Sequence, residues 1–284
     1  MNILIADSGS TKTEWILIDD EGHKEYFHTD GLNPYFMSLE QLIHAIDEGL
    51  AQVLESKPVD KIFFYGAGCG TEKSKEVVRK GIAACFSNAE IQVDTDLLAA
   101  AKACFWDKPG VACILGTGSN SCIYDGEKIV NKIPSLGFTL GDEGSGGYFG
   151  KRILRSYYYN IMPEDLRNEL EQRHDMRLDN ILEMVYKKPK GNRFVASFSH
   201  LLGNFADHDF IKNIVRSGFE DFADKQLAYF GDLSGKEIGF VGSIAAIHRE
   251  TLESVLSERG LNLSVIVRKP IERLVENHLK ESKA

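Results

Sequence analysis

The feature that most constrains the fold is an arrangement that occurs twice along the chain. An apolar strand meets a turn rich in glycine and hydroxyl residues, and a second strand, an acidic turn and a third strand follow. In the first copy the strand Asn2–Ala6 meets the turn Asp7–Thr13, and the chain resumes as the strand Glu14–Ile18. In the second copy the turn Gly116–Ser119 lies between two similar apolar runs. Because short apolar runs bounded by such turns are typical of hairpins, the repetition predicts two similar lobes.

Each copy continues with alternating strand and helix patterns. The other predicted strands are Tyr26–His28, Lys61–Tyr65, Glu90–Asp94, Val111–Leu115, Asn120–Tyr124, Lys128–Lys132, Ile238–Val241 and Leu263–Val267. Helical spacing is found over residues 39–53, 77–83 and 246–259, through a long insertion from about residue 146 to 233, and from Pro270 onward. The periodic aromatic residues of the insertion, such as Phe194 and Phe198, are expected to form a core. The pattern predicts an α/β protein.

Length, charge and cysteine content narrow the function classes. A chain of 284 residues is long for one core, which favours two domains. The formal charge of -9 argues against nucleic-acid and anionic-membrane partners. The five cysteines form no C-x-x-C pair, so neither a disulfide framework nor a zinc site is indicated. No charged and apolar leader precedes the first strand, which favours the cytoplasm.

The two glycine-containing turns point to phosphate. Consecutive backbone N–H groups can converge on an anion only where bulky side chains are absent. The spacing is not that of G-x-x-x-x-G-K-[ST], so a hairpin rather than a helix would hold the phosphate. Asp7, at the end of the first strand, would face a hydrated Mg²⁺ ion, and Thr13 would add a hydroxyl donor. The candidate residues for ATP phosphates are Gly9, Ser10, Thr11, Lys12, Gly116, Thr117, Gly118 and Ser119.

These motifs carry a resemblance to a known superfamily. The run Asp7–Thr13 resembles the first phosphate motif of the sugar kinase, heat-shock ATPase and actin superfamily. The sequences GTGSN at Gly116–Asn120 and GDEGS at Gly141–Ser145 resemble the N-acetylglucosamine kinase group, which shares a family with the BadF/BadG/BcrA/BcrD ATPases. The resemblance implies two ribonuclease H-like (actin-like ATPase) lobes, each with a mixed five-stranded sheet flanked by helices, and a cleft between them.

The resemblance also implies a domain division and a set of roles. The lobes span residues 1–110 and 111–270, and a closing helix over 271–284 returns to the first lobe. Asp96 falls at the position of the catalytic base, and Gly242 and Ser243 fall in the adenosine motif. The residues that match sugar-binding positions are Asn33, Thr117, Asn120, Gly137 and Asp142. A homodimer is the family's usual state.

Three positions leave alternatives open. Asp96 precedes an apolar helical run, so it is also a candidate helix N-cap, and Asp94 is a second candidate base. Ser8 stands where many relatives have glycine. Leu136 stands where animal N-acetylglucosamine kinases have a tryptophan, which leaves the preference for an acylated amine open.

The leading hypothesis is an ATP-dependent kinase that phosphorylates an amino sugar, N-acetylglucosamine or glucosamine, at the 6-hydroxyl. A carboxylate that removes the hydroxyl proton as the phosphoryl group arrives is sufficient for this chemistry, and Asp96 is the candidate. One alternative is a BadF-type ATPase that activates a dehydratase or reductase. Another is a non-catalytic sugar sensor.

Overall fold

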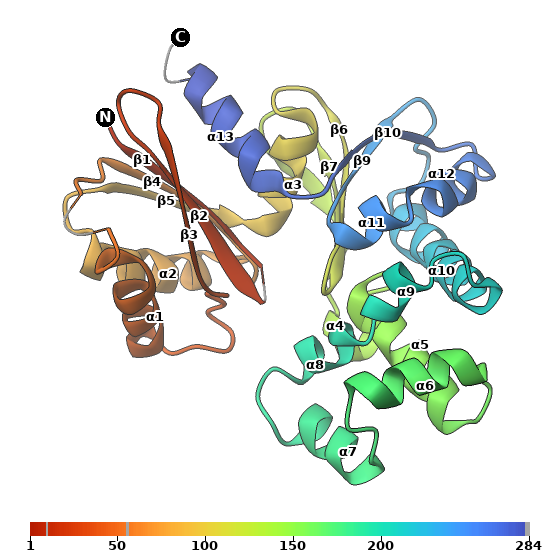
Figure 1. Cartoon of the computed structure of the whole chain (residues 1–284). Helices are drawn as coiled ribbons and strands as arrows, with labels where there is room; N and C mark the ends of the chain where they lie inside the picture. The colour runs from red at the N-terminus through yellow and green to blue at the C-terminus, as the bar shows by residue number, and fades with distance from the viewer. Residues whose placement is uncertain (10, 55–56, 282–284) are drawn as a thin grey trace. The chain divides into compact units, whose positions relative to one another are not determined.

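The computed structural model describes residues 1–9, 11–54 and 57–281. The chain divides into two compact units. The first contains Met1–Asp107 and the segment from Lys269 onward, and the second contains Lys108–Arg268. The chain therefore leaves the first unit once and re-enters it near its end, as the colour gradient of Figure 1 allows the reader to follow.

The first unit is built on a mixed five-stranded sheet in the order β3-β2-β1-β4-β5. Its strands are β1 (Ile3–Ser8), β2 (Lys12–Ile18), β3 (Lys24–Asp30), β4 (Lys61–Gly66) and β5 (Glu90–Thr95). β2 is antiparallel to β1 and β3, whereas β1, β4 and β5 are parallel. The carboxyl ends of these three parallel strands consequently meet at one edge of the sheet, where ligands bind in open α/β sheets.

Helices cover both faces of this sheet (Figure 1). α1 (Leu39–Ile46), the π-helix η1 (Asp47–Ala51) and α2 (Glu72–Cys85) pack on one face, and α3 (Asp96–Phe105) and α13 (Pro270–Glu281) pack on the other. β1 alternates accordingly: Leu4 and Ala6 join the first cluster, and Ile3 and Ile5 join the second. This two-sided burial explains why β1 is a continuous apolar run.

The second unit repeats the strand pattern. Its sheet has the order β10-β9-β6-β7-β8, in which β10, β9 and β6 are parallel and β7 is antiparallel to both β6 and β8. The strands are β6 (Gly110–Leu115), β7 (Ser119–Tyr124), β8 (Ile129–Lys132), β9 (Glu237–Val241) and β10 (Asn262–Val267). Two mixed five-stranded sheets with flanking helices are the predicted α/β fold, which is confirmed.

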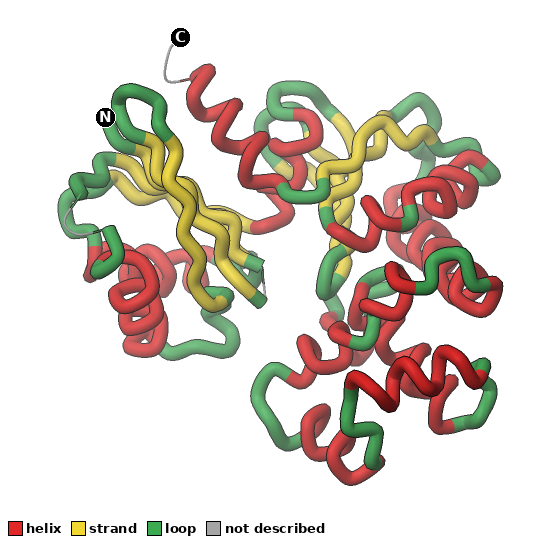
Figure 2. Tube along the Cα trace, in the orientation of Figure 1, coloured by secondary structure: helices red, strands yellow, loops and turns green. Residues whose placement is uncertain are grey.

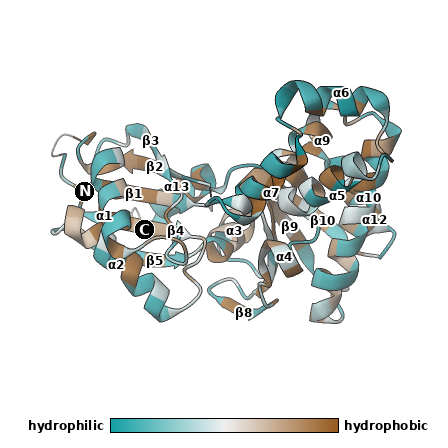
Figure 3. Ribbon diagram, turned by 90° about the horizontal axis from the view of Figure 1, so that it is seen from below, coloured by the Kyte–Doolittle hydropathy of each residue, from teal (hydrophilic) through white to brown (hydrophobic). Residues whose placement is uncertain are grey.

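The segment between β8 and β9 is helical, as Figure 2 shows in red. It contains α4 (Gly137–Leu140), α5 (Gly146–Tyr158), α6 (Glu164–Arg173), α7 (Leu178–Tyr186), α8 (Gly191–Ser197), α9 (His200–Asn204), α10 (Asp209–Phe222), the π-helix η2 (Ala223–Leu227) and the 3₁₀ turn η3 (Ala228–Phe230). Phe149, Phe198, Phe219 and Phe222 are fully buried in its core, and Phe194 packs against it, so the aromatic residues are core as expected. In contrast, α6 is largely hydrophilic (Figure 3) and buries only Leu166 and Leu170.

One predicted helix is wrong. The sequence predicts a single helix over Ala246–Arg259, but the structure has α11 (Ser243–Ile247) and α12 (Arg249–Ser257). The break lies at His248, whose φ of -110° and ψ of 36° are not helical. No glycine or proline marks it; the buried His248 ring accompanies the bend, and tertiary packing overrides local propensity here. Among the described residues, no helix has the length and apolar character needed to span a membrane.

Candidate active site

The first candidate phosphate loop is the turn between β1 and β2. The strands stay paired as far as Ser8 and Thr13, and the Gly9 N–H donates to the Lys12 carbonyl at 3.0 Å. The Ser8 and Thr13 side chains are buried, and their hydroxyl oxygens lie 2.8 Å apart. The expectation that Thr13 offers a donor to phosphate is therefore wrong, because its hydroxyl is already bonded inside the sheet. Ser10 lies outside the described residues.

Lys12 does not stand alone in this turn. Its ammonium nitrogen lies 2.5 Å from Glu14 Oε1, and the Lys269 ammonium reaches the same oxygen at 2.9 Å. Burial opposes the charge of Glu14, but hydrogen bonds from the two lysines outweigh it and hold the pKa of Glu14 below its ordinary value. Glu14 thus forms ion pairs both with the turn, through Lys12, and with the segment that re-enters the first unit, through Lys269.

Two carboxylates lie close together at the carboxyl edge of the first sheet. Burial, together with the negative charges of Asp96 and Glu14, raises the pKa of Asp7 to about 7. The sheet brings these groups together, because Asp7 lies beside Glu14 on β2 and Asp96 directly follows Thr95, the last residue of β5. A group of like charges that raises a carboxylate pKa in this way favours binding of a cation.

The donor set fits a magnesium ion that retains most of its waters. Among residues 1–9, 11–54 and 57–281, no group of three or more His, Cys, Asp or Glu side chains is arranged to hold a metal. Mg²⁺ is usually bound through one or two carboxylates together with substrate phosphates, so Asp7 suits the role that the sequence predicts.

The environments of Asp94 and Asp96 differ. Asp94 Oδ1 accepts a hydrogen bond from the Lys75 ammonium at 2.8 Å. Asp96 is the first residue of α3, and its Oδ1 accepts from the Leu97 N–H at 2.8 Å. The N-cap is Thr95, whose hydroxyl accepts from a backbone N–H in the first turn, so the interpretation of Asp96 as the N-cap is wrong. Asp94 is held by a cation, whereas the negative charge of Asp96 helps to raise the pKa of Asp7.

Asn33 is buried in the first unit, at the start of the loop before α1. Its Oδ1 accepts from the Tyr35 N–H at 3.0 Å, and a Cβ on Gly68 would lie 2.2 Å from the same oxygen. Gly68 has a φ of +84°, so the loop after β4 needs glycine both for its backbone and for its contact with Asn33. Among the described residues, no acceptor lies within hydrogen-bond reach of Asn33 Nδ2.

The second candidate phosphate loop joins β6 to β7. The Gly116 N–H donates to the Gly118 carbonyl at 3.0 Å, and the carbonyls of Gly116 and Thr117 accept from the Gly146 and Gly147 N–H groups at 2.8 and 2.9 Å. The turn is thereby fixed to the start of α5. Such anchoring gives the loop a defined shape before any ligand binds.

Asp142 packs against this turn. Its Oδ1 accepts from the Ser119 N–H at 3.2 Å, and a Cβ on Gly118 would lie 2.9 Å from Oδ2. The Ser119 N–H is therefore already used and is not available for phosphate. Asp142 has a φ of +63°, and burial raises the pKa of its carboxyl above the ordinary value. The second unit thus brings together the predicted residues of the GTGSN and GDEGS motifs.

The remaining predicted residues of the second unit lie around these motifs. Asn120 is on β7 and its Oδ1 accepts from the Ser121 N–H. Gly137 begins α4 with a φ of +70°. Gly242 follows β9 with a φ of +124°, and a Cβ there would lie 2.3 Å from the Leu115 carbonyl oxygen. Gly242 and Ser243 therefore lie at the edge of the sheet where β6 also ends.

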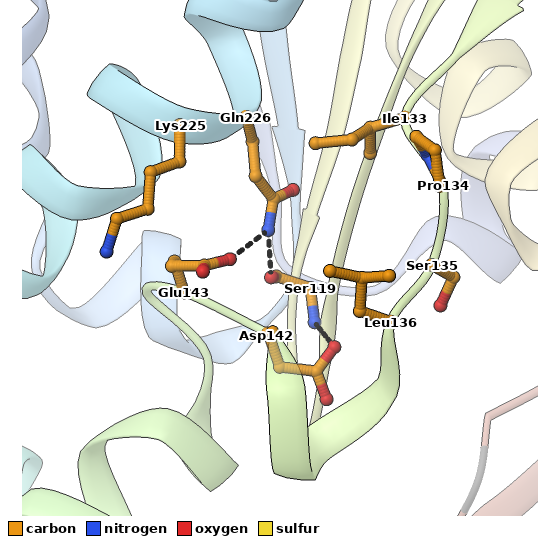
Figure 4. Close-up of a pocket in the computed structure, with 10 residues that line it drawn as sticks. Ser119, Ile133, Pro134, Ser135, Leu136, Asp142, Glu143, Lys225 and Gln226 are labelled. Carbon is orange, nitrogen blue, oxygen red and sulfur yellow. Dashed lines mark hydrogen bonds between the residues drawn. The ribbon is translucent and has the colours of Figure 1, made fainter.

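A pocket of about 240 Å³ opens beside Asp142 within the second unit (Figure 4). Its lining residues are Ser119, Ile133, Pro134, Ser135, Leu136, Gly141, Asp142, Glu143, Lys225 and Gln226. No sequence pattern pointed to Gln226, which is buried on the π-helix η2. π-helices are rare and are found frequently at functional sites.

Comparison with known proteins places the chain in a family. The model of the BadF/BadG/BcrA/BcrD ATPase family matches residues 6–270. The chain belongs to this family. A crystal structure from Porphyromonas gingivalis, provisionally assigned as an N-acetylglucosamine kinase, is 36% identical and has a TM-score of 0.92, with 99% of each chain covered.

Two further relatives extend the comparison. N-acetyl-D-glucosamine kinase from Dictyostelium discoideum is 28% identical over 164 residues, which are 52% of this chain and 51% of that protein. The chain thus matches about half the length of this curated relative. A structure from Chromobacterium violaceum, also provisionally assigned as an N-acetylglucosamine kinase, has a TM-score of 0.72 at 16% identity, covering 97% and 98% of the two chains, and supports the fold alone.

Proposed function

We propose that this protein is an ATP-dependent kinase that phosphorylates the 6-hydroxyl of an amino sugar, N-acetylglucosamine or glucosamine. The observation that carries the proposal is the placement of Asp7 near the end of β1 and of Asp96 directly after β5, where the charge of Asp96 helps to raise the pKa of Asp7. The 36% identity, over 99% of the chain, to the protein provisionally assigned as an N-acetylglucosamine kinase supports the substrate class.

Asp96 is the general base in this proposal. It accepts the proton of the sugar hydroxyl as the γ-phosphoryl group of ATP arrives. The Lys75 ammonium forms an ion pair with Asp94 and occupies one of its oxygens, which favours Asp96. The hydrogen bond from Leu97 N–H to Asp96 Oδ1 helps to fix the orientation of the carboxylate.

The other residues position the two substrates. Asp7 would hold a magnesium ion, which supplies charge neutralisation to the phosphates when bound. Gly9, Thr11, Lys12, Gly116, Thr117 and Gly118 would contact the phosphates, and Gly242 and Ser243 the adenosine. Asn33, Thr117, Asn120, Gly137 and Asp142 would bind the sugar. Exclusion of water from these groups prevents hydrolysis of ATP.

A sugar panel tests the proposal. ADP release is measured with ATP, Mg²⁺ and a series of hexoses, and we expect turnover with amino sugars well above the rate without sugar. Asp96→Asn should lower kcat by about 10²- to 10⁴-fold while nucleotide binding persists. The matched control Asp94→Asn removes the neighbouring carboxylate and should change kcat by less than about tenfold.

Two other outcomes would contradict the kinase. ATP turnover that ignores every sugar would favour the dehydratase or reductase activators of the same family. Sugar binding without phosphoryl transfer would favour a sensor. The proposal also includes a cytoplasmic homodimer. Light scattering of the purified protein measures its molar mass and so tests whether it is a dimer.

A further inference from the structure

One carboxylate oxygen in the first unit holds two ammonium groups. Glu14 Oε1 lies 2.5 Å from the Lys12 nitrogen and 2.9 Å from the Lys269 nitrogen. Lys12 precedes Glu14 by two residues on β2, so the two side chains lie on the same face of the strand. Lys269 is distant in the sequence and is the first residue of the segment that re-enters the unit. The fold thus adds a second lysine to the first candidate phosphate loop.

The three side chains differ in exposure. That of Glu14 is 11% exposed, whereas those of Lys12 and Lys269 are 57% and 60% exposed. An ammonium group has three N–H donors, and among the described residues Glu14 is the only partner of either group. The buried carboxylate therefore holds two cations at the surface, and each cation keeps donors for a ligand. Two ammonium groups against one carboxylate also leave a surplus positive charge.

This positive charge lies on the face of the sheet that carries the candidate magnesium ligand. Asp7 is directly opposite Glu14 in the β1–β2 pair, and side chains of directly opposite residues lie on the same face of a sheet. Burial and the charges of Asp96 and Glu14 raise the pKa of Asp7, and the charge of Lys12 opposes this rise. Surplus cations and a cation-binding carboxylate are therefore neighbours at the carboxyl edge of the first sheet.

Ammonium donors beside a carboxylate that suits Mg²⁺ match a polyphosphate that carries this ion. We propose that Lys269 is a further phosphate-binding residue of the first phosphate loop and that Glu14 positions it beside Lys12. Lys269 precedes Pro270, the buried first residue of α13, and a residue before proline is restricted to extended backbone. Its side chain therefore starts from a defined point of the chain. This inference rests on the proposed kinase function and extends its phosphate site beyond the two glycine-containing turns.

A matched control separates phosphate binding from attachment of the last helix. Lys24 on β3 pairs with Glu272 on α13 at 3.4 Å, so this ion pair also connects α13 to the first sheet. Lys24 lies opposite Ile18, at the end of β2 remote from Lys12. Lys24→Met therefore removes an ion pair to α13 without touching the phosphate loop. If Lys269 only attached the helix, Lys24→Met and Lys269→Met would have the same effect.

Calorimetric titration with ATP and Mg²⁺ in the absence of sugar tests the proposal. Lys269→Met should weaken ATP binding at least about tenfold, because it removes a charge-assisted hydrogen bond. Lys269→Arg keeps the charge and should bind ATP within about threefold of wild type. Adenosine, which has no phosphate, should bind to Lys269→Met as well as to wild type, which also shows that the variant is folded. Lys24→Met should leave ATP binding unchanged.

A double-mutant cycle tests the role of Glu14. In the Glu14→Gln background the carboxylate no longer holds Lys269 beside Lys12. The additional substitution Lys269→Met should therefore weaken ATP binding by less than about threefold in this background. A loss as large as in the wild-type background would show that Glu14 does not position Lys269.

The outcomes separate this inference from the kinase proposal. ATP binding that Lys269→Met leaves unchanged, or that Lys24→Met weakens equally, overturns the inference, and sugar phosphorylation by the same protein leaves the kinase intact. ATP binding that depends on Lys269, in a protein that phosphorylates no sugar, supports the inference and overturns the kinase. Absence of ATP binding overturns both.

Discussion

The attachment of the last helix to the first sheet should depend on pH through His278. This histidine is 4% exposed, and its Nε2 lies 2.9 Å from the Tyr65 hydroxyl. Its ring stacks on Phe63 with centroids 4.0 Å apart and meets the edge of Trp106 at 5.4 Å. Burial, assisted by the charge of Lys102, lowers the pKa of His278 to about 4. The folded protein therefore holds a neutral imidazole that the unfolded chain protonates more readily.

The magnitude follows from the two pKa values. The ordinary value of 6.5 and the folded value of about 4 differ by about 2.5 pH units. At about 1.36 kcal/mol per unit, His278 contributes about 3 kcal/mol at neutral pH, of which about 2 kcal/mol is lost by pH 5. Because the unfolded state binds more protons between these pKa values, the contribution is complete above about pH 6.5 and declines as the pH falls toward about 4.

Urea unfolding at about pH 7.5 and about pH 5 measures this contribution. The protein has two tryptophans, Trp15 and Trp106, and both belong to the first unit, so their fluorescence reports on it. The variant His278→Gln has no imidazole to titrate. On acidification its free energy of unfolding should therefore fall by about 2 kcal/mol less than that of wild type. His248→Gln, which removes a buried histidine from the second unit, is the control and should leave the tryptophan signal's pH dependence unchanged. An identical pH dependence in wild type and His278→Gln would refute the reasoning.

Three further predictions concern the site and its frame. Asp7→Ala should raise the Mg²⁺ concentration needed for half-maximal ATP turnover by at least about tenfold. Asp20→Ala, at an exposed position, is the control and should leave this concentration unchanged. If both variants need the same Mg²⁺ concentration, Asp7 does not bind the metal. Gly242→Ala should lower the free energy of unfolding by at least about 2 kcal/mol, because its Cβ would lie 2.3 Å from the Leu115 carbonyl oxygen. Gly116→Ala is the control, because a Cβ there meets no atom within 4 Å. Equal denaturation midpoints of the two variants would contradict this prediction. Burial raises the pKa of Cys69 and Cys122 to about 12. Iodoacetamide at about pH 8 should therefore alkylate these thiols at least about 100-fold more slowly in the native protein than in urea, as measured by mass spectrometry. Comparable rates in the two conditions would show that the thiols are exposed.

The sequence was sufficient to predict the sheets, because their strands carry strong local signals. β1 is a continuous apolar run that ends in a turn of small residues, and the same signal recurs at β6. The register follows from the hairpin, since the turn brings Asp7 opposite Glu14 and fixes every pair behind it. Local pattern and tertiary fold agree in these segments.

The sequence was less informative where the site depends on contacts between side chains or on local backbone geometry. Gln226 lies on a π-helix more than a hundred residues from Ser119, and only the folded second unit brings the two within 2.7 Å. Asp96 was a candidate N-cap of α3, but Thr95 takes that position, and only the backbone geometry decides between two neighbouring residues that can both cap a helix. Thr13 was expected at the phosphates, but strand pairing places its hydroxyl beside Ser8.

The return of α13 to the first unit has a consequence for synthesis on the ribosome. The β1 side chains Ile3 and Ile5 pack against Ile271 and Leu274, which are translated after the whole of the second unit. One face of the first sheet therefore emerges early and is covered only by α3, without α13, until the end of translation. Chains released before Lys269 would expose this apolar surface. Although the amino-terminal half is synthesised first, its folding should therefore depend on a nascent-chain chaperone or on the elongation rate until translation ends.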